Sequence, residues 1–534
     1  MPFNSYSFLF AFLPITVLVF WAIAVHGRRE FALVWLLLAS IVFYTSVSLT
    51  SFLIIVPSLL FDFGLARFML TVGEKKPSWC STAFVVGVTA NLLFLGYFKY
   101  KNFFLSTSNE SLGTHFVLMP MLLPLGISFL VFQKIAFLGD VRSGAIERVP
   151  ILEFLLFTLF FPRTIAGPIT HYEEVVPQLR NKIQERVTTH LSVGLCLLSI
   201  GLFKKCLIAD NLASFVDPAF GPFPEPMLAD FPPSLTIAWA GVLSYTLQLY
   251  FDFSGYSDMA LGIARMLGVR LPMNFNSPFK ASNIVEFWSR WHITLTRFLT
   301  AYIYTPIVLR MTRRRVTKGN AVLSGGTSKI SAIATLVAFP TLVTMTLSGL
   351  WHGAGWQFVV WGALHGVYIT VNQTWRLIRP RVWPDSAGYR RIMEPVGCVL
   401  TFGCVVGSLV FFRASSFSAA ILILRGLAGL NGILPRAFQI LNSAHIHSDW
   451  PTIAVELPTE ALWWIVTLIP AVMLLPNSLE LLRRFEPALD SSEIQKSRKW
   501  EFVFSPVSAF LMALIALLSV LSLSQAGGFV YGQF

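Results

Sequence analysis

Ser348-Gly-Leu-Trp-His-Gly-Ala-Gly-Trp-Gln-Phe-Val-Val-Trp-Gly-Ala-Leu-His-Gly366 ends an apolar segment that is long enough to cross a membrane, and it contains two histidines. A helix that faces only lipid gains nothing from an imidazole, whose two ring nitrogens are costly to take out of water unless they are hydrogen-bonded. Two glycine pairs spaced four residues apart, Gly349 with Gly353 and Gly362 with Gly366, allow helix backbones to approach closely. The stretch therefore predicts a helix packed inside a bundle of membrane helices, with a histidine held in the interior.

The composition is that of a polytopic membrane protein. Of the 534 residues, 55% are hydrophobic and only 13% are charged, whereas about a quarter of a soluble domain is charged. The net charge of +13 comes from basic residues in short loops between apolar segments. This pattern indicates a positive-inside topology and contact with the lipid bilayer, and it argues against nucleic acid as a partner. The five cysteines form no CxxC pair, so no disulfide framework is predicted.

We predict an all-α fold with about a dozen apolar segments, some of them re-entrant rather than spanning, because a span needs roughly 20 apolar residues. We treat 1–534 as one transmembrane domain, with a motif-bearing core at 85–412, an extramembrane loop at 413–460 and C-terminal helices at 461–534. Pro120 and Pro124 should kink one of the segments. The candidate segments are Ser5–Val25, Phe31–Ser46, Ser51–Leu70, Ala83–Phe98, Val117–Leu138, Ile151–Ala166, His190–Ile208, Leu235–Tyr250, Ile330–Leu350, Phe358–Val371, Pro395–Phe412, Ala461–Leu475 and Val507–Ser524.

A polar stripe runs along one otherwise apolar helix. Tyr245, Gln248, Asp252 and Tyr256 are spaced so that they share one helical face. Lipid does not tolerate an ionised aspartate, so the stripe indicates a water-containing cavity or a partner helix. In the alternative interpretation, Asp252 pairs with a basic residue and only fixes helix packing.

The segment that begins at Asn274 is semi-polar and rich in aromatic residues. Ser282 is a plausible N-cap, and Glu286 with Arg290 has the spacing of an ion pair on the helix that follows. Trp288 and Trp291 fit an aromatic belt, so this helix could lie along the membrane surface.

The histidines divide into stronger and weaker candidates for chemistry. His352 has very apolar surroundings, and a neutral imidazole there can act as a general base towards a hydroxyl that attacks an acyl thioester. The alternative is a hydrogen-bonded core histidine, and the same two readings stay open for His292. His365 is expected to serve in packing or to support the residues of the site from behind. The sequence has no nucleophile elbow, HExxH motif, Walker loop or CxxC pattern, so no metal site and no tightly bound cofactor are predicted.

Several motifs, in one order over most of the chain, resemble the membrane-bound O-acyltransferase family, and its alginate O-acetyltransferase branch in particular. They are Gly96-Tyr-Phe-Lys-Tyr100, Leu123-Pro-Leu-Gly-Ile-Ser-Phe129, Ile165-Ala-Gly-Pro168, Gln248-Leu-Tyr-Phe-Asp-Phe-Ser-Gly-Tyr-Ser-Asp-Met-Ala260, Glu286-Phe-Trp-Ser-Arg-Trp-His-Ile-Thr294, Gly349-Leu-Trp-His-Gly353, Phe411-Phe-Arg413 and Phe529-Val-Tyr-Gly-Gln-Phe534.

The resemblance implies a ring of about 11 tilted transmembrane helices around a central funnel, in the inner membrane of a bacterium. It implies that His352 is catalytic and that His292 lies on the cytoplasmic side of the tunnel. An acyl thioester, acetyl-CoA for the alginate branch, is then the donor, and a periplasmic serine-hydrolase-like partner passes the acetyl group to an exported polysaccharide. The residues expected to line the tunnel are Tyr245, Gln248, Asp252, Tyr256, Asn274, Glu286, Arg290, Trp291 and Trp351.

The chain departs from the family pattern after Leu295. The family usually continues with an Arg-Asp pair and a Pro-Leu-Gly-Gly-Asn run, but this chain has Arg297-Phe-Leu-Thr-Ala-Tyr-Ile-Tyr-Thr-Pro-Ile-Val-Leu309 and then a basic run. The departure leaves the donor open and suggests an acceptor other than alginate. Two alternatives remain at this point. One is transfer of a D-alanyl or another acyl group to an envelope polymer or protein. The other is proton-coupled transport, which is weakened by the lack of a visible internal repeat.

Overall fold

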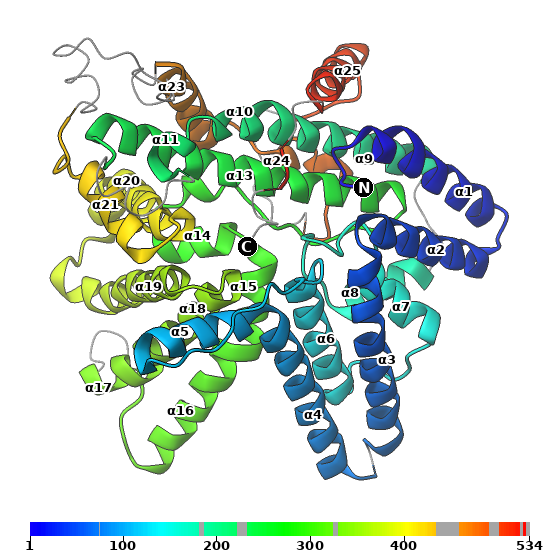
Figure 1. The fold of residues 1–534 in the computed structure, drawn as a ribbon, viewed down its shortest axis with the longest axis horizontal. Helices are drawn as coiled ribbons and strands as arrows, with labels where there is room; N and C mark the ends of the chain where they lie inside the picture. Colours follow the sequence, from blue (N-terminus) through cyan, green and yellow to red (C-terminus); the bar gives the residue numbers. More distant parts are fainter. Residues whose placement is uncertain are drawn as a thin grey trace. The chain divides into compact units, whose positions relative to one another are not determined.

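The computed structural model describes residues 1–73, 75–180, 186–221, 232–323, 329–433, 459–490, 501–523 and 527–529. These residues form an all-helical structure, as predicted, and no strand occurs in them. The chain divides into two compact units. Unit 1 comprises 1–206, 254–274 and 478–533, and unit 2 comprises 207–253 and 275–477 with the final residue. Figure 1 shows the helices and their labels.

Unit 1 contains the N-terminal helices and the three helices that the structure describes after residue 477. Buried polar side chains tie three of its helices together, since Lys134 of α6 pairs with Asp62 of α3 at 3.0 Å and Asn91 of α4 donates to the same carboxylate at 2.8 Å. Figure 1 shows these three helices side by side. The helices of unit 1 are η1 (Phe8–Phe12), α1 (Leu13–Val25), α2 (Arg29–Val47), α3 (Leu49–Val72), α4 (Pro77–Leu95), η2 (Gly96–Tyr100), α5 (Lys101–Leu112), α6 (Ile127–Arg142), α7 (Ile151–Leu159), α8 (Tyr172–Arg180), α9 (Val187–Leu202), α24 (Ser478–Leu481), η8 (Arg483–Phe485) and α25 (Pro506–Leu521), while η3 (Phe203–Ala209) begins in unit 1.

Unit 2 contains the histidine-rich segments. The long helix α13 (Leu235–Met266) contributes its first part to unit 2 and its last part to unit 1. The other helices of unit 2 are α10 (Asp210–Ala213), α11 (Asp217–Phe220), η4 (Pro278–Lys280), α14 (Ile284–Arg290), α15 (Ile293–Leu299), η5 (Thr300–Tyr304), α16 (Thr305–Thr317), α17 (Ile330–Ile333), η6 (Ala334–Ala338), α18 (Phe339–His352), α19 (Trp356–Val382), α20 (Ser386–Arg413), α21 (Phe417–Leu427) and α23 (Thr459–Leu474).

Seven helices among the described residues are long and apolar enough to cross a membrane, fewer than the segments proposed from sequence. They are Phe8–Val25, Arg29–Val47, Leu49–Val72, Pro77–Leu112, Val187–Ala213, Ile330–His352 and Ser386–Arg413. The predicted extramembrane loop at 413–460 begins with α21, and residues 434–458 of it lie outside the described part of the chain. Residues 530–534 of the closing motif also lie outside it.

Two predicted segments were wrong as continuous helices. Residues 113–124 are not helical, and α6 starts only at Ile127, because Pro120 and Pro124 lack the N–H groups that a helix needs. Gly126 precedes α6 with a φ of +67°, and a Cβ there would lie 2.6 Å from the Thr164 carbonyl oxygen. The segment that starts at Ile151 is helical only to Leu159, since the residue before Pro162 disfavours the helical conformation.

The glycine-rich stretch folds as a helical hairpin. Helix α18 ends at His352, the extended residues Gly353 and Gly355 make the turn, and α19 returns alongside α18. A Cβ on Gly349 would lie 2.1 Å from the Phe358 carbonyl oxygen, and one on Gly362 would lie 2.2 Å from the Met345 carbonyl oxygen. The predicted close packing through glycine is thus confirmed, and it takes place between these two helices.

Gly349→Ala should lower the thermal stability of the purified protein, because the added methyl group has no room and overpacking costs about 1–3 kcal/mol. The matched control is Gly407→Ala in α20, where a Cβ meets nothing within 4 Å. This control should leave the melting temperature unchanged or raise it slightly, since alanine favours helix. Equal losses in both variants would contradict the packing assignment.

Candidate active site

His352 lies at the end of α18 inside a ring of aromatic side chains. Its ring centroid is 4.9 Å from that of Trp351 and 5.1 Å from those of Trp361 and Phe412. Its side chain is buried, with 5% of the residue exposed. Trp361 comes from α19 and Phe412 from α20, so three helices position this imidazole.

His365 is held at both ring nitrogens. The Trp288 indole N–H donates to His365 Nδ1 at 3.2 Å. Since an indole N–H can only donate, the remaining proton of the neutral ring belongs on Nε2, which lies 2.9 Å from the Ser408 hydroxyl. That hydroxyl donates in turn to the Val405 carbonyl oxygen at 2.8 Å. His365 therefore joins α14, α19 and α20 through its two hydrogen bonds.

His292 lies between two short helices rather than within one. Helix α14 ends at Arg290 and α15 begins at Ile293, and His292 has a φ of +44°. The helix that carries Glu286 and Arg290 therefore ends before His292. A non-glycine residue in this backbone region is strained, and such strain collects at functional sites.

Trp351 contacts both candidate catalytic histidines. Its ring centroid lies 6.2 Å from that of His292, in addition to its contact with His352. On its other side, His292 meets Phe253 edge-to-face at 4.9 Å. The structure thus brings the two histidines to the same indole.

Trp288 in α14 and Trp291 at its C-cap do not form an exposed aromatic belt. Trp288 and Trp291 are 5% and 7% exposed, so the prediction of an aromatic belt at the membrane surface was wrong. Trp291 instead stacks on Phe287 at 5.7 Å and meets Phe275 edge-to-face at 5.1 Å. Hydrogen bonding to His365 and this ring packing explain why both indoles are buried.

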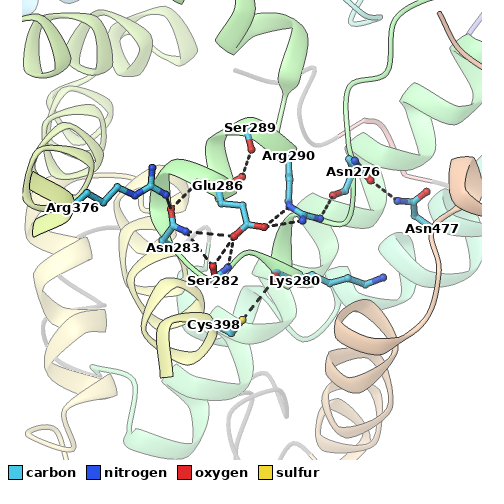
Figure 2. A network of polar contacts seen from close by, with 10 residues as sticks. All are labelled: Asn276, Lys280, Ser282, Asn283, Glu286, Ser289, Arg290, Arg376, Cys398 and Asn477. Atoms are coloured by element: carbon cyan, nitrogen blue, oxygen red, sulfur yellow. Dashed lines mark hydrogen bonds and ion pairs between the residues drawn. The ribbon is translucent and has the colours of Figure 1, made fainter. Parts of the chain in front are cut away.

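A polar network surrounds the start of α14 (Figure 2). One carboxylate oxygen of Glu286 accepts from the Ser282 backbone N–H at 2.9 Å and from its hydroxyl at 2.8 Å. The other oxygen accepts from Arg290 Nη2 at 2.8 Å, which confirms the predicted ion pair. The N-cap is Asn283 and not Ser282, because Asn283 Oδ1 accepts from the Glu286 N–H at 3.0 Å.

This network also sets the charge state of Glu286 and the path of the neighbouring chain. Burial raises the pKa of Glu286, but the Ser282 hydrogen bonds and the Arg290 charge outweigh burial and hold the pKa below its ordinary value. Arg290 also donates to the Asn276 carbonyl oxygen at 3.3 Å, and the Arg290 carbonyl oxygen accepts from the Asn276 N–H at 2.9 Å. The turn that carries His292 is therefore anchored immediately before it.

The polar stripe of α13 is buried, in agreement with the prediction that it avoids lipid. Tyr245, Gln248 and Asp252 belong to unit 2, while Tyr256 belongs to unit 1. Asn274 also belongs to unit 1, where its amide donates to the Ser257 hydroxyl at 3.4 Å. Their role in lining a tunnel stays a prediction, as it does for Glu286 and Arg290.

Sequence reasoning missed Trp361, Ser408 and Phe412 as neighbours of the histidines. Trp361 lies in the same glycine-rich stretch as His352. The glycines between them indicate a turn, which could have predicted that Trp361 returns towards His352. The other two come from α20, and no spacing rule links them to α18.

Comparison with known proteins identifies the family. The model of the membrane-bound O-acyltransferase family (MBOAT) matches residues 39–325. Peptidoglycan O-acetyltransferase of Helicobacter pylori is 33% identical over 100% of this chain and 97% of that protein. Probable alginate O-acetylase AlgI of Pseudomonas aeruginosa is 34% identical over 79% of this chain and 73% of that protein. Teichoic acid D-alanyltransferase of Streptococcus thermophilus is 27% identical over 54% of this chain and 68% of that protein. The chain belongs to the membrane-bound O-acyltransferase family and is an acyltransferase.

The stability of the protein should fall as the pH falls below about 6.5. Burial lowers the pKa of His292 from its ordinary value of 6.5 to about 3. Between these two values the unfolded chain binds a proton that the folded chain does not, so the contribution of His292 is complete above 6.5 and decreases by about 1.4 kcal/mol per pH unit towards 3.

The measurement is the melting temperature in detergent from pH 8 to pH 5, for the wild type and for His292→Gln. Other groups titrate equally in both proteins, so the variant should show the shallower decline. Parallel curves would contradict the burial of a neutral His292.

Proposed function

We propose that this chain transfers acetyl groups from a cytoplasmic thioester for the O-acetylation of a cell-envelope glycan, with peptidoglycan as the best-supported acceptor. The carrying observation is coverage: the peptidoglycan O-acetyltransferase aligns with the whole chain, whereas the alginate O-acetylase aligns with 79% of it. The departure from the family pattern after Leu295 also favours an acceptor other than alginate. The apolar helices and the basic loops support a location in a bacterial inner membrane.

In the proposed reaction, His352 is the general base. The neutral imidazole takes the proton from the acceptor hydroxyl while that oxygen forms a bond to the thioester carbonyl carbon. The carbon–sulfur bond then breaks, and the imidazolium returns its proton to the departing thiolate. The aromatic side chains of Trp351, Trp361 and Phe412 around His352 support this role, because they keep bulk water away from the base.

His292 is proposed to position the thioester end of the donor. Its contact with Trp351, which also touches His352, supports a shared path for the acyl group. A periplasmic serine-hydrolase-like partner is proposed to receive the acetyl group, because a membrane-embedded base by itself cannot reach a polymer outside the membrane.

A second candidate is aminoacyl transfer, which the similarity to teichoic acid D-alanyltransferase favours. The two candidates differ in their donor. Purified protein supplied with acetyl-CoA labelled in the acetyl group should release or transfer the label if acetyl-CoA is the donor. Labelled acetyl-CoA that stays intact over many turnover times would favour a carrier-bound aminoacyl donor instead.

His352→Gln should abolish O-acetylation of the envelope glycan in cells, because glutamine keeps the size of the side chain and cannot act as a base. A loss of about 10²–10⁴-fold is expected for removal of a general base. The measurement is the acetyl content of purified peptidoglycan and of secreted polysaccharide, with membrane abundance determined in parallel.

The matched control is His26→Gln, since His26 is exposed at the end of α1. It should leave acetylation unchanged. Acetylation that persists in His352→Gln at normal abundance would refute the assignment of the base. Loss of acetyl groups from the secreted polysaccharide alone would refute peptidoglycan as the acceptor.

A further inference from the structure

Two tryptophans contact the same histidine but differ in their hydrogen bonding. Trp288 and Trp361 have ring centroids 5.2 Å and 4.8 Å from that of His365. They are 5% and 4% exposed. The Trp288 N–H is bonded to His365, whereas the buried Trp361 N–H has no hydrogen-bond partner among the described residues.

An orphan N–H of this kind calls for an explanation. A buried donor without an acceptor is destabilising, and native structures contain few of them. Trp361 lies edge-to-face against His352, with an interplanar angle of 88°. The unbonded donor therefore belongs to a side chain in direct contact with the proposed base.

A second unbonded donor lies on the same helix as His352. The Ser348 hydroxyl is fully buried and also has no hydrogen-bond partner among the described residues. Ser348 is four residues before His352 in α18, so the two residues share a face of that helix. One donor without an acceptor among the described residues thus contacts the imidazole, and a second shares its helical face.

We propose that the Trp361 N–H and the Ser348 hydroxyl donate hydrogen bonds to the carbonyl oxygen of the acyl group during transfer. This inference rests on the proposed role of His352. When the acceptor oxygen bonds to the carbonyl carbon, the carbonyl π electrons move onto its oxygen as His352 takes the proton. The two donors stabilise this oxyanion until the carbon–sulfur bond breaks and the thiolate takes the proton back from His352. Donors aimed at a developing charge in a site that excludes water are among the largest contributions to catalysis.

Trp361→Phe tests the proposal because it removes the N–H and keeps an aromatic ring. The assay is thiol release from acetyl-CoA by the purified full-length chain, with a small soluble alcohol supplied as the acceptor. We expect kcat to fall by about 10²–10³-fold, the typical loss for one oxyanion donor, with KM for acetyl-CoA little changed. The melting temperature should fall less than in the control described next, because the lost ring volume is partly offset by removal of an unsatisfied buried donor.

Trp288→Phe is the matched control. It makes the same chemical change on an equally buried indole, but it leaves His365 Nδ1 without its donor, so its melting temperature should fall. Ser348→Ala is the second variant and should lower kcat without lowering stability, since the hydroxyl makes no hydrogen bond to any residue that the structure describes.

Wild-type kcat in Trp361→Phe and in Ser348→Ala would overturn the proposal. A joint loss of stability and activity in Trp361→Phe, like that expected of the control, would also overturn it by showing a packing role. If His352→Gln retains thiol release, the proposed function itself fails. If only His352→Gln is inactive, the base assignment stands and the oxyanion assignment fails.

Discussion

The approach of α18 to α19 through glycine is the constraint on which the histidine site depends. With Gly349 and Gly362 at the contact, carbonyl oxygens of each helix occupy the space where a side chain would stand. The hairpin turn between the helices places Trp361 of the returning helix against His352. A wider separation of the helices would remove that contact and admit water to the imidazole. Small residues at a helix interface are the usual means of close packing in membranes.

In an apolar interior, the role of a polar side chain depends on the hydrogen bonds that it makes. His365 has a donor on one ring nitrogen and an acceptor on the other, and its chain of bonds ends on a backbone carbonyl. His352 lies against the rings of Trp351, Trp361 and Phe412. The two histidines are thirteen positions apart in one stretch of sequence. His365 is held by hydrogen bonds at both ring nitrogens, and His352 lies against Trp361, whose N–H has no acceptor among the described residues.

The sequence predicted the features that depend on spacing within one element. The glycine pairs, the ion pair of Glu286 with Arg290 and the buried stripe of α13 all follow from helical periodicity. The sequence could not predict features that depend on contacts with residues from other helices and loops. Tryptophans such as Trp288 and Trp291 are typical of a membrane-interface belt, but here a hydrogen bond to His365 and packing against other rings bury them. The break at His292 has no glycine or proline to mark it, and contacts to Asn276 and Phe275 from the preceding loop support it.

Unit 1 is built from three separate parts of the chain, and this has a consequence for biosynthesis. Its first 206 residues leave the ribosome long before residues 478–533, which belong to the same unit. At about 5–20 residues per second, the interval is on the order of half a minute. During that time the part of α9 that α25 will contact is still uncovered. Completion of unit 1 is therefore a late event, and a ribosome that stops early leaves an unfinished protein in the membrane.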